Sequence, residues 1–208
     1  MKRKTLLAIE IALLAGLAVA LGWGAGAVST RREVSDKVVR LHVLANSDSG
    51  EDQALKYRVR DAVLGEITEL VSTSADRSQA EGLIRGQLLE LEALAAREIA
   101  AAGYDYAVTA QLKKMDFPTR EYESFTLPAG NYLALQIVIG EGKGQNWWCV
   151  VFPSLCLPAA GESTEDVAAG AGFSEELTDT VTQKPNYRIR FFFMDVIGKI
   201  ENLFFQSE

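Results

Sequence analysis

Residues 127–156, LPAGNYLALQIVIGEGKGQNWWCVVFPSLC, constrain the fold of this 208-residue chain more than any other stretch. The first part carries aliphatic side chains at alternate positions, so a β-strand would place them all on one face. These residues are Leu133, Leu135, Ile137 and Ile139. The glycine-rich segment 140–146 follows, and glycine readily takes the positive φ angles of tight turns. A second apolar run, WWCVVF, then ends at Pro153. The pattern predicts a β-hairpin.

The glycine-rich segment does not indicate a nucleotide site. A phosphate cradle needs a strand, a glycine-rich turn and then a helix whose N-terminal N–H groups face the anion. Here the turn leads into residues 147–152, which have the composition of a strand. An ordinary hairpin loop is therefore expected.

The first 28 residues have the pattern of an export segment. A basic cluster, Lys2-Arg3-Lys4, precedes a run that is apolar apart from Glu10, and Ala25-Gly26-Ala27 fits a signal-peptidase site. The run is also close to the length that spans a bilayer, so residues 1–28 are either a signal peptide or a membrane anchor. The preceding positive charge keeps the N-terminus cytoplasmic. In both cases we expect the chain after about Ser29 to be exported.

A strand and two helices are expected next. Residues 38–44 form an apolar strand candidate, and the turn ANSDSG leads into a helix from about Glu51, with Asp48 as N-cap and Glu51 completing a capping box. A second capping box, Ser78 to Glu81, starts another helix, which Gly103 ends as a C′ glycine. Both helices carry apolar side chains at helical spacing, so they are expected to form an αα-hairpin.

The remaining pattern completes the fold prediction. Alternating apolar residues predict a strand at 104–115, and a short strand is expected at 121–126. We therefore predict an α+β domain at residues 36–157: an antiparallel β-sheet with an αα-hairpin packed on one face. Small and polar residues at 158–186 indicate a flexible insert. Residues 187–208 are expected to form a strand and helix tail.

Charge and composition exclude several classes of function. The formal net charge is −7, whereas a protein that binds the nucleic-acid backbone is normally basic, so no nucleic-acid partner is expected. His42 is the only histidine. One histidine and two cysteines make a poor zinc set, and we expect neither a metal nor another cofactor.

The two cysteines, Cys149 and Cys156, allow three readings. In an oxidising compartment they are expected to form a disulfide, provided that the turn at Pro153 brings their Cα atoms within about 4.4–6.8 Å. They could instead be buried thiols that pack as small hydrophobic groups. The third reading is a hydrolase in which Cys149 is the nucleophile and His42 the base.

Two blocks of the chain resemble a known family. RLHVLANSDSGEDQALKYRVRDAVL, from Arg40 to Leu64, and the block from Phe117 to Cys156 resemble the stage II sporulation protein R family. The likeness covers residues 38–156 and includes an N-terminal export segment. The NSDS turn, LPAG, GEG and NWWCVVFP carry it. Ser154 stands where the family often has a second proline.

The resemblance implies a signal rather than an enzyme. Family members are made in the forespore and exported into the space between the two membranes. There they activate a membrane-embedded aspartic protease of the mother cell, which removes the pro-sequence of sigma E. An envelope module that binds peptide or glycan through its tryptophans is the alternative to this function and to the hydrolase.

A polar loop and an exposed aromatic side chain suit a protein interface. Adjacent strand residues point to opposite faces, so one of the two tryptophans is expected in the core and the other at the surface. The candidate partner-binding residues are Asn46, Ser47, Asp48, Arg120, Trp147 and Trp148. For the first three, a turn with a helix cap is the structural alternative.

Overall fold

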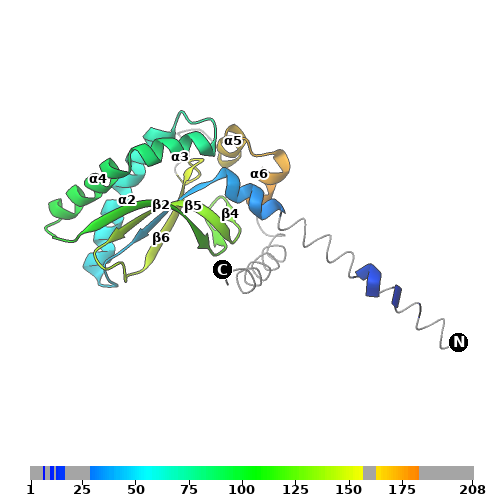
Figure 1. Cartoon of the computed structure of the whole chain (residues 1–208), viewed down its shortest axis with the longest axis horizontal. Coiled ribbons are helices and arrows are strands. Elements are labelled where there is room, and N and C mark those ends of the chain that lie inside the picture. Colours follow the sequence, from blue (N-terminus) through cyan, green and yellow to red (C-terminus); the bar gives the residue numbers. More distant parts are fainter. Residues whose placement is uncertain (1–6, 8–9, 12, 17–28, 157–162, 183–208) are drawn as a thin grey trace.

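The structure is a computed structural model that describes residues 7, 10, 11, 13–16, 29–156 and 163–182. Residues 29–37 are helical and lead into the first strand. The elements that follow are β1 (Val39–Leu44), α2 (Gly50–Val71), α3 (Arg77–Gly86), α4 (Leu88–Ala101), β2 (Val108–Phe117), β3 (Arg120–Glu121), β4 (Thr126–Leu127), β5 (Gly130–Ile139), β6 (Asn146–Phe152), α5 (Thr164–Gly170) and α6 (Glu175–Thr182). Figure 1 shows α2, α3 and α4 along the sheet, with α5 and α6 near one end of it.

The main sheet has the strand order β2-β5-β1-β6. The predicted α+β class is confirmed, but the sheet is mixed, because β1 runs parallel to β5 and antiparallel to β6. The predicted hairpin of β5 and β6 is wrong: both strands are present, and β1 lies between them. Every residue of β1 except Leu44 is buried, and a strand buried on both faces is most stable in the middle of a sheet.

Helices α2, α3 and α4 cover one face of the sheet. Their apolar side chains form a single core with those of β1, β5 and β6, which include Leu41, Leu135 and Cys149. The predicted second helix is in fact two, because Gln87 is both the C-cap of α3 and the N-cap of α4. Gly103 takes a φ of 86° just past the end of α4, as its predicted C′ role requires.

The two helix N-caps lie next to the predicted positions. The side chain of Ser49, not Asp48, accepts the hydrogen bond from the N–H of Asp52 at the start of α2. The side chain of Asp76, not Ser78, accepts from the N–H of Gln79 at the start of α3. Serine and aspartate are equivalent as caps, so sequence alone left this choice open by one or two residues.

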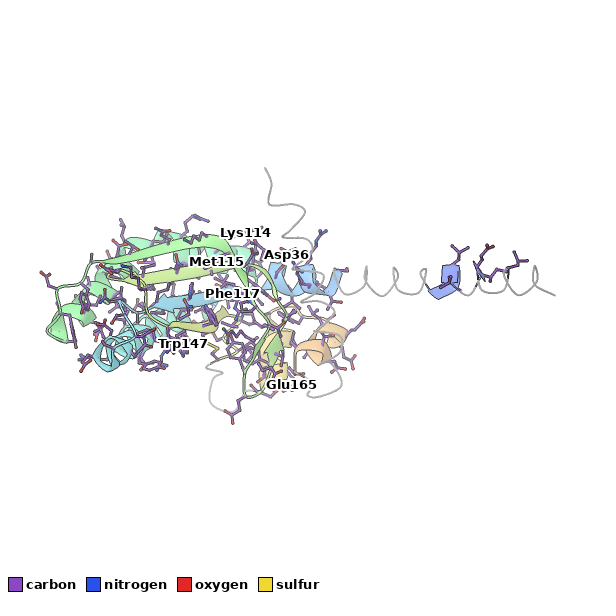
Figure 2. All side chains as sticks on the ribbon, turned by 90° about the horizontal axis from the view of Figure 1, so that it is seen from below. Asp36, Lys114, Met115, Phe117, Trp147 and Glu165 are labelled. Atoms are coloured by element: carbon purple, nitrogen blue, oxygen red, sulfur yellow. A yellow bond between two sulfur atoms is a disulfide. The ribbon has the colours of Figure 1, made fainter. Side chains whose placement is uncertain are left out.

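The opposite face of the sheet has a core of its own. It contains the second set of strand side chains, the β3–β4 ribbon, residues 34 and 38, and helices α5 and α6. Ala168, Phe173, Leu177 and Val181 are buried in it. Within the predicted flexible insert at 158–186, residues 164–170 and 175–182 form helices α5 and α6, and Ala168 and Leu177 pack on this face. Figure 2 labels Phe117 on the sheet and Glu165 on α5, and side chains fill the space between these two elements.

Most of residues 1–28, part of the insert and the predicted tail at 187–208 lie outside the described residues. Within the described part of the chain, no helix combines the length and the apolar character needed to cross a membrane.

Candidate partner-binding surface

The second face of the sheet carries a row of polar and aromatic side chains that crosses all four strands. Strand pairing aligns Gln111 of β2 with Gln136 of β5, Gln136 with His42 of β1, and His42 with Trp148 of β6. We call these four residues the polar row. Gln111 is exposed, Gln136 and Trp148 are half-buried, and His42 is buried at the centre. Arg40 lies two residues before His42 on the same face of β1. Next to the polar row at this end of the sheet, α5, α6 and the β3–β4 ribbon pack.

His42 is held in the row by hydrogen bonds to both ring nitrogens. Its Nε2 lies 2.6 Å from the Oδ1 of Asn146, and the Nε2 of Gln136 lies 3.2 Å from its Nδ1. The amide nitrogen of Gln136 can only donate, so Nδ1 accepts and Nε2 carries the proton that it donates to Asn146. Burial lowers the pKa of His42, and the nearby positive charge of Lys113 acts in the same direction. The imidazole is therefore neutral at pH 7.

Trp148 is the aromatic end of the polar row, and Arg120 stacks on it. The guanidinium carbon of Arg120 lies 3.6 Å from the centroid of the Trp148 ring. Arg120 comes from the β3–β4 ribbon, so this stack joins the ribbon to the edge strand β6. Trp148 also packs near the rings of His42 and Phe117. Arginine and tryptophan are the residues most enriched at the energetic centres of protein interfaces.

Trp147 points to the opposite face of the sheet, as the strand pattern predicted. It packs against the core beneath α2, and the guanidinium of Arg60 lies 4.8 Å from its ring centroid. Both tryptophans are half-buried, so neither is a fully exposed anchor. The structure therefore brings Arg120 and Trp148 together and separates Trp147 from them.

Asn46, Ser47 and Asp48 connect two loops. Asn46 accepts from the N–H of Glu141, and Asp48 accepts from the N–H of Gln145. Ser47 donates to Asp52 at 2.5 Å. The contacts of these three residues do not overlap with those of Arg120 and Trp148, and each has the structural role that a turn would give it.

The structure contains a disulfide between Cys149 and Cys156, whose Cα atoms are 6.3 Å apart. Cys149 pairs with Leu41 and belongs to the core beneath the helices. His42 is the neighbour of Leu41 on β1 and points to the other face. Cys149 and His42 therefore do not meet, and the predicted nucleophile–base pair of a hydrolase is not assembled.

Sequence reasoning missed Gln136, Asn146 and Arg40. Gln136 and Arg40 are polar residues inside apolar strand runs, and Arg40 alternates with His42 on one face of β1. That signal was readable in the sequence. The residues that lie beside them in the sheet could not be read from the sequence, because those neighbours depend on the position of β1 between β5 and β6.

No group of histidine, cysteine, aspartate and glutamate side chains suited to a metal ion occurs among the residues that the structure describes. The fold and the surface together define a small mixed α+β domain with a polar, aromatic sheet face.

Comparison with known proteins gives the family. The model of the family described as Stage II sporulation protein R matches residues 35–162. Stage II sporulation protein R of Bacillus subtilis (strain 168) is 36% identical over 193 residues, which cover 88% of this chain and 86% of that protein. The chain belongs to the stage II sporulation protein R family, and a role in sporulation follows. No solved structure matches it.

Proposed function

We propose that this protein is an exported sporulation signal. It activates a membrane-embedded aspartic protease of the mother cell, and that protease removes the pro-sequence of the sigma E precursor. Family membership supports the sporulation role. The basic and apolar pattern of residues 1–28 supports export to the space between the forespore and mother-cell membranes, either secreted or anchored by residues 5–28.

The Arg120–Trp148 stack is the observation that carries the proposed contact with the protease. The stack lies at the aromatic end of the polar row, in which Gln136 and Asn146 hold His42 in place through both ring nitrogens. An aromatic and cationic centre with a polar margin is the usual composition of a protein-binding surface. Activation in this proposal is a binding event, and the protein itself needs no nucleophile.

Co-expression tests the function directly. The full-length protein is produced together with the candidate protease and the sigma E precursor in a host that lacks all three, and removal of the pro-sequence is scored by immunoblot. Wild-type protein is expected to trigger processing. Absence of processing with protein, protease and precursor all present and exported would overturn the proposed function.

Two variants test the surface. Arg120→Gln removes the guanidinium from Trp148, and loss of a central interface arginine costs about 1–2 kcal/mol, or roughly 5–30-fold in activation. The matched control is Arg60→Gln, because Arg60 lies over Trp147 on the opposite face of the sheet. The control is expected to process the precursor normally. Equal effects of the two variants would show that the contact lies elsewhere.

The envelope-module alternative predicts a different result for Trp148. One face of its ring is covered by Arg120, which leaves little ring surface for a sugar to stack on. Binding of the exported protein to purified cell-wall glycan, lost in Trp148→Ala, would favour that alternative.

A further inference from the structure

Arg40 is a buried arginine to which the described residues offer no anion. Its side chain is fully buried at the centre of the sheet, on the same face as the polar row. Its Nη2 donates a hydrogen bond of 2.7 Å to the hydroxyl of Tyr122. Its Nε and Nη1 are also buried, and neither has a hydrogen-bond partner in the part of the chain that the structure describes. Two of the three guanidinium nitrogens are therefore unsatisfied.

The described residues supply Arg40 with no carboxylate. Neither Arg40 nor Arg120 takes part in the ion pairs among the described side chains. Desolvation lowers the pKa of Arg40, and the other groups that act on its charge are Tyr122, Tyr132 and Arg120. Arginine nevertheless stays protonated in proteins, so a positive charge is buried here.

Aromatic rings compensate this charge in part. The guanidinium carbon of Arg40 lies 4.1 Å from the centroid of Phe117 and 5.0 Å from that of Tyr132. Such contacts stabilise a cation over a ring face, but they satisfy none of its N–H donors. A buried charge without a paired, hydrogen-bonded anion is among the most costly features a fold can retain.

A second guanidinium lies beside the first. The Nε of Arg120 is buried and also lacks a hydrogen-bond partner, and the charge of Arg120 acts on both Arg40 and Tyr122. Lys113 stands in the same row of the sheet as Arg40, separated from it by Ala134. This part of an otherwise acidic protein is thus locally cationic, which complements a carboxylate.

The element that covers Arg40 is not part of the main sheet. Arg120 belongs to β3, and Tyr122 lies in the turn that joins β3 to β4, two strands of two residues each. The ribbon strands pair with each other and not with the main sheet. Movement of the ribbon therefore breaks no strand pairing of the main sheet.

We propose that Arg40 and Arg120 together receive a carboxylate side chain of the partner protein. A guanidinium donates charge-assisted hydrogen bonds to a carboxylate, and two guanidiniums together satisfy both carboxylate oxygens. The β3–β4 ribbon shifts to admit the carboxylate, and the Arg120–Trp148 stack is the outer margin of the same site. The identity of the partner rests on the proposed function; the carboxylate site itself does not.

The first test separates stability from function at Arg40. Methionine has a similar shape and no charge, so Arg40→Met is expected to keep or raise the melting temperature of the full-length protein. The same variant is expected to lose at least tenfold in precursor processing on co-expression. Arg60→Met, on the other face of the sheet, is the control and is expected to process normally. Normal processing by Arg40→Met would overturn the proposal.

The second test needs neither the protease nor a folded Arg40 variant. Thermal unfolding of the full-length protein in detergent is measured in sodium acetate and in sodium chloride at equal ionic strength. Acetate is expected to raise the melting temperature by about 3–6 °C at ten times its dissociation constant. Arg120→Gln is expected to lose most of this shift, and Arg60→Gln to keep it.

The outcomes of the two tests are distinguishable. An equal melting temperature of the wild-type protein in the two salts, or an acetate shift that Arg120→Gln retains in full, would overturn the carboxylate site. If wild-type protein triggers no processing, the proposed function fails, and the acetate measurement alone decides the carboxylate site.

Discussion

The side-chain oxygen of Asn46 accepts a hydrogen bond of 2.9 Å from the backbone N–H of Glu141, 95 residues further along the chain. This bond joins the loop after β1 to the loop between β5 and β6. Two backbone bonds, from Lys143 to Asn46 and from Gly144 to Ala45, reinforce it. The NSDS turn and the glycine-rich segment are therefore one structural unit at the end of the sheet. We expect changes at Asn46 to act first on stability.

Gly140→Ala is expected to destabilise the fold. Gly140 has a φ of +56°, and a Cβ there would collide with the side chain of Asn46. Strain of this kind costs about 1–3 kcal/mol. The control is Gly65→Ala in the middle of α2, where a Cβ meets no atom within 4 Å and alanine should stabilise the helix by roughly 0.5–1 kcal/mol. Urea denaturation measures both, and a Gly140→Ala variant as stable as wild type would contradict the prediction.

His42 is expected to make stability depend on pH. Burial lowers its pKa below the ordinary value of 6.5, so the unfolded chain binds a proton more readily than the folded one. Its contribution to stability is present above about pH 6.5 and is lost as the pH falls towards the folded-state pKa. Melting temperatures between pH 5 and 8 should show this decline, and His42→Gln should flatten it. An equal slope in the variant would assign the dependence to other groups.

Loss of the disulfide is expected to weaken the fold. Cys149 and Cys156 are 7 residues apart, and closing so small a loop stabilises by about 2–3 kcal/mol in the chain-entropy model. Cys149→Ser should therefore lower the stability of the exported protein by a similar amount. Mass spectrometry without reductant is expected to show the peptide spanning both residues two daltons lighter than its reduced form. Rapid alkylation of Cys149 alone in that sample would show a free thiol and contradict the disulfide.

Export is expected to be required for signalling. The basic cluster and apolar run of residues 1–28 have the pattern of an export segment. Deletion of residues 2–28 should abolish precursor processing, while the core formed by residues beyond 33 still gives a cooperative melting transition. Full processing by a strictly cytosolic variant would contradict this prediction.

Sequence alone determined the local features and the family. Alternating apolar residues located β5, capping boxes located the starts of α2 and α3 to within two residues, and Gly103 marked the end of α4. These signals are short-range, because capping bonds and strand alternation involve residues only a few positions apart. The motifs NSDS, LPAG and NWWCVVFP indicated the family, which the comparisons confirmed.

Only the tertiary structure decided which strands are neighbours and what their side chains meet. A strand presents the same N–H and C=O groups at either edge, so its pattern fixes which side chains share a face and not which strand lies beside it. Burial of β1 on both faces placed it between β5 and β6. That one placement aligned His42 with Gln136 and Trp148, and it enclosed Arg40 among aromatic rings, where no described residue supplies an anion.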